Sequence, residues 1–320
     1  MRVAGRLIAL SLVFCGSIAT AQAQDPAIAW AYPGSSEKMP FPELPATTSY
    51  HVEGSALSYT GQQINDADVI DWLPERHPAP PDIVLHGAKD REIAPCGGCH
   101  GVEGQGFLSV PNLAGLKASY IAQQLHEMAA GRRRSAVSDR PAVAYMDKLA
   151  GTLTEPEITA VAAYFSAIPR RSAFFRVVET ASVPRTSTHA HGWQTALPGG
   201  DSEPLGRRVV IHAEDFDQMW AGDPLATAVA YVPTGAIERG RELVQHGAQR
   251  CTSCHGAASK GAGAAPALAG RNPQYLARQI WDIRTGARTG PAVSLMQKPA
   301  AALSADQLVD VVAYLASLAP

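Results

Sequence analysis

Two short stretches of this chain hold cysteine and histidine side chains at a spacing that can bind a cofactor. Residues 96–100 read CGGCH, and residues 251–255 read CTSCH. Two thiols three positions apart can add to the two vinyl groups of one haem, and the next residue can then direct its imidazole at the iron from the same side. The C-x-x-C-H spacing is typical of c-type haem attachment. The sequence therefore predicts two covalently bound haem c groups, attached through Cys96, Cys99, Cys251 and Cys254.

Two other uses of a C-x-x-C pair remain open at this point. Such pairs form half of many zinc sites, and in other proteins they form redox-active disulfides. The histidine that follows each pair fits neither use well, whereas it fits an axial ligand of haem iron. We therefore favour haem, with His100 and His255 as the proximal iron ligands. The fifth cysteine, Cys15, lies in an N-terminal segment that resembles a signal peptide.

The two motifs belong to an internal repeat, which is a feature to seek early in any sequence. A shift of 155 residues pairs Tyr120 with Tyr275, Gln124 with Gln279 and Arg133 with Arg288. The first copy then carries five extra residues, after which a shift of 150 pairs Met146 with Met296 and Tyr164 with Tyr314. This register predicts two copies of one domain, at 82–170 and 234–320.

The same helices are expected to position the motif in each copy. A short helix should precede each motif, near 83–93 and 237–246, and a loop rich in Gly and Pro follows it. Apolar residues then recur at helical spacing over 119–131 and 274–286. Each copy should close with a helix that begins after Thr154 or Ser304, because Glu157 and Gln307 three residues later complete a capping-box pattern.

The remaining axial position of each iron is assigned to methionine. A methionine thioether raises the reduction potential of a haem. The second copy contains one methionine, Met296, and the repeat pairs it with Met146. Met128 pairs with Ile283 and is interpreted as a core residue. Ligation of either iron by a second histidine, His126, His189, His191 or His246, would break the repeat symmetry. His189 and His191 could form a metal site of their own, but they are expected to be solvated, as is His246.

Six further residues recur at matching positions and are candidates for supporting roles. Backbone carbonyl groups near Pro111 and Pro266 are expected to accept a hydrogen bond from the second nitrogen of each proximal imidazole. Arg133 and Arg288 are candidates to pair with haem propionates, although a solvated arginine is an equally good interpretation. Tyr164 and Tyr314 are expected to pack either on the porphyrin or on the first helix of each domain.

Three segments lie outside the repeat. Residues 1–23 combine Arg2 and Arg6, an apolar run and an Ala-x-Ala site, which is the pattern of a secretory signal peptide; an uncleaved anchor is the alternative. Residues 24–81 form a Pro-rich leader, expected to be an extended wrap or partly disordered. Residues 171–233 connect the domains and are too long for a simple linker. We expect the connection to hold a short strand in RRVVIHAEDF and to pack on one or both domains.

The motifs resemble those of the class I c-type cytochromes, and two such domains in tandem are similar to the dihaem cytochrome c-four type. The resemblance covers roughly 82–170 and 234–320, through CxxCH-G, the P-x-L-A-G loop, the Y-x-x-x-Q helix, the late methionine and the final helix. It implies an all-α fold of two haem domains, joined by a long connection and preceded by an irregular leader. It also implies His/Met ligation and electron transfer in the bacterial periplasm.

Composition agrees with an electron carrier. The chain has 27 Lys and Arg against 29 Asp and Glu, a formal net charge of −2, so nothing indicates nucleic-acid binding. We expect a non-enzymatic protein without catalytic residues, which passes electrons from a dehydrogenase or quinol-oxidising complex to an oxidase or reductase. The alternative is a dihaem enzyme, either peroxidase-like or thiosulfate-oxidising. Such an enzyme would need an open iron or a cysteine ligand.

Overall fold

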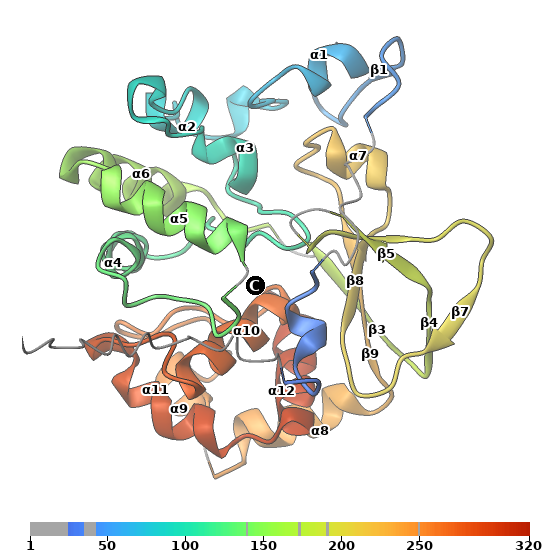
Figure 1. The fold of residues 1–320 in the computed structure, drawn as a ribbon, viewed down its shortest axis with the longest axis vertical. Helices are drawn as coiled ribbons and strands as arrows, with labels where there is room; N and C mark the ends of the chain where they lie inside the picture. The colour runs from blue at the N-terminus through green and yellow to red at the C-terminus, as the bar shows by residue number, and fades with distance from the viewer. Residues whose placement is uncertain (1–24, 35–42, 139, 172–173, 190–191, 249) are drawn as a thin grey trace, which may run out of the picture.

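The computed structural model describes residues 25–34, 43–138, 140–171, 174–189, 192–248 and 250–320. The predicted signal peptide, 1–23, lies outside the described residues. Two helical units lie one above the other in Figure 1, and a β-rich unit lies beside them. Among the described residues, no helix is long and apolar enough to cross a bilayer.

The first helical unit is built on the first sequence copy. Its helices are α2 (Asp82–Leu85), α3 (Cys96–His100), α4 (Ala118–Ala129), α5 (Pro141–Thr152) and α6 (Glu155–Ala167). Helix α4 packs on both α5 and α6. The helix expected over 83–93 is shorter than predicted: it ends at Leu85, and a 3-10 turn over Lys89–Arg91 follows it. Helix α5, which carries Met146, had no expected counterpart in the sequence.

The second helical unit repeats this order. Its helices are α8 (Ala236–Gln245), α9 (Thr252–His255), α10 (Pro273–Arg284), α11 (Pro291–Ala302) and α12 (Ala305–Ser317). Helices α8 and α12 cross closely at Gly240. A Cβ atom there would lie 2.0 Å from the carbonyl oxygen of Asp310, so this crossing requires glycine.

Both predicted capping boxes are confirmed. The Thr154 side chain accepts from the backbone N–H of Glu157, and the Glu157 side chain accepts from the backbone N–H of Thr154. Ser304 and Gln307 form the same reciprocal pair at the start of α12. These caps satisfy backbone N–H groups that a helix leaves without partners. They fix where the last helix of each copy begins.

The connection is β-rich, so the expectation of an all-α chain holds for the two helical units and not for the chain as a whole. Strands β3 (Phe175–Thr180), β9 (Ala228–Pro233) and β8 (Val210–Ala213) form one sheet, with β9 in the centre. Strand β3 runs parallel to β9, and β8 runs antiparallel to it. The two smaller antiparallel pairs are β4 (Ser182–Pro184) with β7 (Ser202–Pro204), and β5 (Thr186–Thr188) with β6 (Gln194–Ala196). The strand expected in RRVVIHAEDF is β8.

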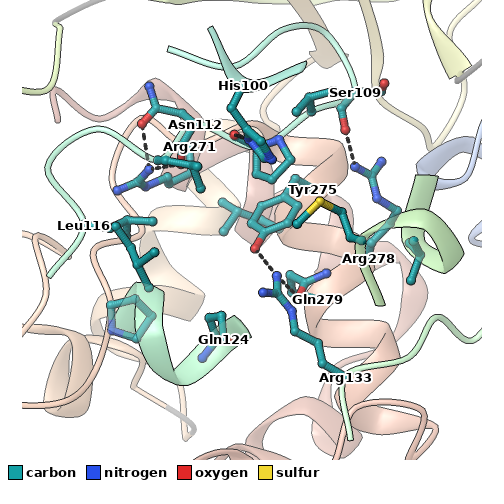
Figure 2. Close-up of a pocket in the computed structure, with 18 of the residues that line it drawn as sticks. His100, Ser109, Asn112, Leu116, Gln124, Arg133, Arg271, Tyr275, Arg278 and Gln279 are labelled. Carbon is teal, nitrogen blue, oxygen red and sulfur yellow. Dashed lines mark hydrogen bonds between the residues drawn. The ribbon is translucent and has the colours of Figure 1, made fainter. Parts of the chain in front are cut away.

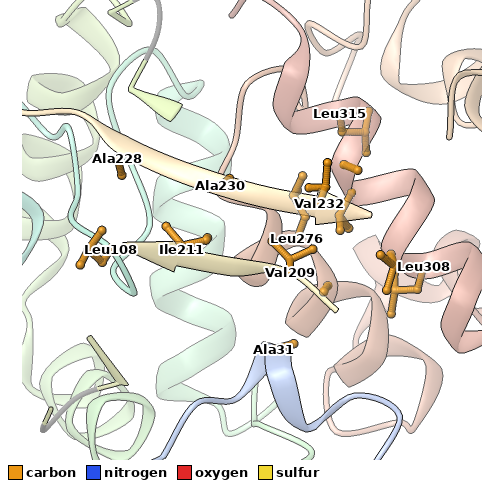
Figure 3. Packing of buried hydrophobic residues seen from close by; sticks show 14 of the residues in the cluster. Ala31, Leu108, Val209, Ile211, Ala228, Ala230, Val232, Leu276, Leu308 and Leu315 are labelled. Carbon is orange, nitrogen blue, oxygen red and sulfur yellow. The ribbon is translucent and has the colours of Figure 1, made fainter. Parts of the chain in front are cut away.

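The three-stranded sheet packs on the second helical unit, and Figure 3 shows this packing for residues of β8 and β9. Val209, Ile211 and Val232 from the connection share one hydrophobic core with Leu276 of α10 and Leu308 of α12. The expected packing of the connection on a helical unit is therefore confirmed. Every second residue of β8 and β9 joins this core, namely Ile211, Ala213, Ala228, Ala230 and Val232, and burial of this face of the sheet ties the connection to α10 and α12.

The leader is an extended wrap built of short elements. It contains 3-10 turns over Ala29–Ala31 and Pro74–Arg76, strands β1 (Ser49–Tyr50) and β2 (Tyr59–Thr60), and helix α1 (Gly61–Asn65). Leu44, Val52, Ile64, Trp72 and Leu73 form a small core of their own with Ala221 of the connection. The indole Nε1 of Trp72 donates to the carbonyl oxygen of Ala221 at 2.8 Å. Ala221 directly follows helix α7 (Phe216–Trp220), so this hydrogen bond anchors the leader to the connection.

Candidate functional site

One cavity of about 1340 Å³ spans both helical units. The residues predicted to attach or ligate haem all line it. They are Cys96, Cys99, His100 and Met146 from the first copy, and Cys251, Cys254, His255 and Met296 from the second copy. The structure thus brings together, around one continuous space, side chains from two motifs 155 residues apart. Their individual roles toward haem stay predictions.

The two histidines are held in the same way. Each is buried, and each ends the short helix of its motif. Nδ1 of His100 lies 3.0 Å from the carbonyl oxygen of Pro111, and Nδ1 of His255 lies 2.8 Å from that of Pro266. A carbonyl can only accept, so Nδ1 carries the proton and Nε2 keeps its lone pair. This tautomer is the one in which Nε2 can bind a metal.

The local environment favours uncharged forms of the ring and of the thiols. Burial lowers the pKa of His100 and His255, although the proline carbonyl groups act in the opposite direction. Burial raises the pKa of Cys96 to about 12 and also raises that of Cys251. All four motif cysteines are free of disulfide bonds. These positions therefore suit neutral imidazole and an uncharged thioether sulfur.

The two candidate methionine ligands stand on equivalent helices. Met146 lies on α5 and Met296 on α11, and each helix begins with a proline in its first turn. Both side chains are half-buried at the cavity wall. Met128 and Met219 also line the cavity. Met128 packs against the first hydrophobic core, as expected for a core residue, and Met219 is buried in the core shared with the connection.

The recurring arginines contact the opposite copy, as Figure 2 shows for Arg133. Nη2 of Arg133 donates to the hydroxyl of Tyr275 at 2.7 Å. Nη2 of Arg288 donates to the side-chain oxygen of Gln124 at 2.7 Å and contacts the hydroxyl of Tyr120 at 3.4 Å. Arg133 and Arg288 also face each other in an antiparallel backbone bridge. Both arginines line the cavity. Arg288 is 7% exposed and Arg133 is half-buried, so neither is the solvated surface arginine of the alternative interpretation.

Two further arginines at the cavity were missed in the sequence. Nη1 of Arg271 donates to the carbonyl oxygen of Asn112 at 2.7 Å, and Nη2 of Arg278 donates to that of Ser109 at 3.0 Å (Figure 2). The repeat gave no signal, because the first copy has Leu116 and Gln123 at these positions. The i, i+4 pair of Arg278 and Asp282 on an amphipathic helix was an available signal.

The cavity wall has an excess of buried positive charge. Arg271, Arg278 and Arg288 are at most 7% exposed, and Asp282 is a buried carboxylate beside them. Burial lowers the pKa of Arg271 and Arg278, because too few carboxylates compensate them. Nη2 of Arg271 has no hydrogen-bond partner. A haem carries a pair of propionates, so bound haem would supply the missing anionic acceptors. The residues present therefore fit haem.

The sequence profile of the cytochrome c family matches residues 91–168 and 237–319, just over half of the chain. The chain belongs to the cytochrome c family. Two family domains in one chain give this cytochrome two covalently bound haem c groups. The zinc and disulfide interpretations of the two motifs are thereby excluded.

The cytochrome is similar to dihaem proteins over most of its length. It is 27% identical to the thiosulfate dehydrogenase electron acceptor of Stutzerimonas stutzeri, over 74% of this chain and 84% of that protein. It is 26% identical to cytochrome c4 of Pseudomonas aeruginosa, over 72% of this chain and 87% of that protein. The structure of thiosulfate dehydrogenase (TsdBA) from Marichromatium purpuratum matches with a TM-score of 0.50 and 27% identity. That match covers 75% of this chain and 39% of the other chain.

The two recurring tyrosines of the cytochrome lie away from the cavity. The hydroxyl of Tyr164 donates to the carbonyl oxygen of Val102 at 2.9 Å, and the hydroxyl of Tyr314 accepts from Nε2 of Gln245 at 2.6 Å. Gln245 ends α8, so Tyr314 packs on the first helix of its domain. Neither tyrosine is among the described residues that line the cavity.

The other described histidines of the cytochrome do not reach the cavity either. His126 is half exposed and its Nε2 lies 3.0 Å from a carboxylate oxygen of Glu155. His246 is exposed, as predicted. The expected solvation of His189 is wrong: it is 6% exposed and stacks on Phe216 with ring centroids 5.7 Å apart. His191 lies outside the described residues.

Proposed function

We propose that this dihaem cytochrome carries electrons in the periplasm between a dehydrogenase or quinol-oxidising complex and a terminal acceptor, either free or as a cytochrome subunit. The observation that carries the proposal is the matched pair of histidine and methionine side chains, His100 with Met146 and His255 with Met296, around one cavity. Two protein ligands on each iron leave no position for a substrate. The cytochrome then transfers electrons without catalysing a reaction itself.

The surroundings of each site support this role. The hydrogen bonds from His100 to Pro111 and from His255 to Pro266 fix the imidazole rings and make them better ligands. Met146 and Met296 would hold the haem iron through a neutral thioether sulfur, which favours ferrous iron and would raise the reduction potential. When bound, the haems supply the one-electron chemistry, and the protein sets their potentials and keeps water away.

The electron donor that we propose is a thiosulfate dehydrogenase. A relative that shares 27% identity over most of both chains carries the name thiosulfate dehydrogenase electron acceptor. A second relative of the same name, from Thiomonas intermedia, is 26% identical over 71% of this chain. The proposed periplasmic location rests on the signal-peptide pattern of residues 1–23. It agrees with covalent haem attachment, which in an exported chain takes place outside the cytoplasm.

The test is the absorption spectrum of the matured protein, with haem quantified per chain. Two haems per chain and the weak near-infrared band of a methionine–ferric bond are the expected result. One haem per chain, a high-spin ferric spectrum or the absence of that band would overturn two closed centres. An open iron would favour a dihaem enzyme, and peroxide and thiosulfate would then be tested as substrates.

A further inference from the structure

The first described part of the leader, residues 25–34, lies against the second helical unit. Its 3-10 turn, Ala29–Ala31, packs on α10. Ile28, Ala31 and Tyr32 are each at most 3% exposed, and they join the hydrophobic core that contains α10 and α12 (Figure 3). We call residues 25–34 the clamp segment. It is a buried part of the second unit, although it precedes both haem domains in the sequence.

Two charged residues of α10 form hydrogen bonds with the clamp segment. Nη1 of Arg278 donates to the carbonyl oxygen of Ala31 at 2.8 Å. The hydroxyl of Tyr32 donates to Oδ1 of Asp282 at 2.7 Å. Arg278 is 5% exposed and Asp282 is 4% exposed. A buried charge without partners is costly, so both side chains depend on the groups that surround them.

The same two residues also form hydrogen bonds with the first helical unit. Nη2 of Arg278 donates to the carbonyl oxygen of Ser109 at 3.0 Å, as the dashed line in Figure 2 marks. The backbone N–H of Ala136 donates to Oδ1 of Asp282 at 2.8 Å. Each charged residue therefore has one partner in the clamp segment and one partner in the first unit.

Arg278 and Asp282 do not use each other as hydrogen-bond partners. They stand four positions apart on α10, a spacing at which opposite charges on a helix attract each other. In the described part of the chain, their side-chain hydrogen bonds go to the clamp segment and to the first unit instead. The clamp segment thus competes with an ion pair inside α10 and leaves both side chains available to the first unit.

A further contact joins the clamp segment directly to the first unit. The guanidinium carbon of Arg140, at the start of α5, lies 5.6 Å from the centre of the Tyr32 ring. A cation at this distance over an aromatic ring is attracted to it. Tyr32 therefore contacts the first unit through its ring and the second unit through its hydroxyl.

We propose that the clamp segment is part of the interface between the two haem domains, and that Tyr32 is a positioning residue for electron transfer between the haems. Ala31 and Tyr32 hold Arg278 and Asp282 toward the first unit. Without them, the two side chains pair with each other and release the first unit, so the distance between the haems varies. In the transfer, one electron passes from ferrous to ferric iron and no other reactant is needed. The inference rests on the proposed function only where it concerns this transfer.

Four variants of the full-length holoprotein form two matched pairs. Ala31→Gln places a longer side chain at a position that is 0% exposed, so it should displace the clamp segment. Ala29→Gln makes the same change at an exposed position of the same turn. Tyr32→Phe removes the hydroxyl but keeps the ring. Tyr314→Phe is its control, because that hydroxyl contacts Gln245 within the second domain.

Amide hydrogen exchange of the ferrous protein, followed by NMR, measures the interface. Besides Ala136, two amides donate across the boundary: Arg134 to the carbonyl oxygen of Ala287 at 3.0 Å, and Thr289 to that of Arg132 at 2.7 Å. Protection of all three should fall about tenfold in Ala31→Gln and about threefold in Tyr32→Phe. Ala29→Gln and Tyr314→Phe should leave it unchanged.

Two amides within single domains serve as internal references. Gly115 donates to the carbonyl oxygen of Phe165 in the first domain, and Gly270 donates to that of Leu315 in the second domain. Their protection should stay unchanged in all four variants. An equal fall at these references would show a general loss of stability and would overturn the proposal. A fall at Ala136 alone, or at none of the boundary amides, would also overturn it.

A rescue variant tests the pairing of Arg278 with Asp282. Asp282→Asn keeps an oxygen that can accept from the N–H of Ala136, but it has no charge to attract Arg278. Added to Ala31→Gln, this change should restore the protection of Ala136 about threefold. No recovery would show that pairing inside α10 is not the cause of the loss, and the assigned role of the clamp segment would then fail.

The rate of electron exchange between the two haems of the half-reduced protein tests the role in electron transfer. It should fall about threefold in Ala31→Gln and stay unchanged in Ala29→Gln, because the displaced segment no longer fixes the haem domains. An unchanged rate in Ala31→Gln would overturn the positioning role of Tyr32. Failure of the proposed function would appear differently, as a wrong haem content or a missing near-infrared band in the natural protein.

Discussion

Nη1 of Arg271, in the second domain, lies 2.7 Å from the carbonyl oxygen of Asn112, in the first domain. Asn112 follows Pro111, whose carbonyl oxygen orients His100. The Nε atom of Arg271 also lies 3.3 Å from the carbonyl oxygen of Ala267, which follows Pro266 in the second domain. One buried cation therefore contacts both loops that hold the proximal histidines.

Replacement of Arg271 by glutamine should affect both haems. Loss of a positive charge near both proximal loops disfavours the ferrous state, so both reduction potentials should fall, by at most about 60 mV, which is a tenfold change in a one-electron equilibrium. Loss of the charged hydrogen bonds should lower the free energy of unfolding by about 2 kcal/mol. Potentiometric titration and urea unfolding of the holoprotein measure the two effects. Arg284→Gln, at an exposed site, is the control; a fall in one potential alone would contradict the shared role.

Replacement of either candidate methionine should open one iron. Met146→Ala and Met296→Ala should each remove about half of the near-infrared band and lower the potential of one haem, because thioether ligation favours ferrous iron. The double variant should lose the band completely. Met128→Leu, a change in the first core, should keep it. An intact band in Met146→Ala would point to another ligand in the first domain.

The capping box of α6 predicts a pH dependence of stability. Hydrogen bonds from Arg91 and then from Thr154 hold the pKa of Glu157 at about 2, below the ordinary 4.5. A lowered pKa means that the stabilisation is present above pH 4.5 and is lost as the pH falls toward 2. Because the Glu157 side chain is 23% exposed and the pair is screened by solvent, we expect about 1 kcal/mol.

Urea unfolding of Glu157→Gln at pH 7 and pH 3 measures this contribution. The variant should be less stable than the natural protein at pH 7 by about 1 kcal/mol, and this difference should shrink to about half or less at pH 3. Glu155→Gln, at an exposed position of the same helix turn, should behave like the natural protein at pH 7. An equal loss of stability at both pH values would mean that packing, not charge, explains the effect.

Gly240 and Gly151 form a matched pair of glycines in helices. A Cβ atom at Gly240 would meet the carbonyl oxygen of Asp310 at 2.0 Å, whereas a Cβ atom at Gly151 would meet nothing within 4 Å. Gly240→Ala should therefore destabilise the fold by about 1–3 kcal/mol, through overpacking of the α8–α12 crossing. Gly151→Ala should stabilise it by about 0.5–1 kcal/mol, through helix propensity. Thermal unfolding of the two variant holoproteins measures both changes in stability. Equal changes in the two variants would contradict the close crossing of α8 and α12.

The sequence predicts the parts of the fold that depend on local patterns. Thr154 and Ser304 locate the final helices, because a capping box needs residues within one turn. It also predicts the pairing of Met146 with Met296, which rests on a repeat. The helices that carry these methionines were not predicted; in α11, Pro299 inside the helix argues against one.

Relationships between distant segments were outside the reach of the sequence. The strands of the connection are short, and the paired strands β3 and β9 are more than fifty residues apart in the sequence. A local sequence pattern therefore could not predict the sheet. The sequence singled out Arg133 and Arg288 as recurring, but it could not show that each one contacts the opposite copy. Arg271 lacks a repeat partner and contacts Asn112 only through tertiary packing.

Arg133 and Arg288 each donate a hydrogen bond to a side chain of the opposite copy. This reciprocal contact affects which substitutions a duplicated protein can accept during evolution. Duplicated domains are usually free to accumulate substitutions separately. Here a substitution at Arg133 removes a hydrogen bond from Tyr275 in the other copy, and a substitution at Gln124 affects Arg288 in the same way. Neither half can therefore drift alone at these positions, and compensating changes must arise in pairs across the boundary between the copies.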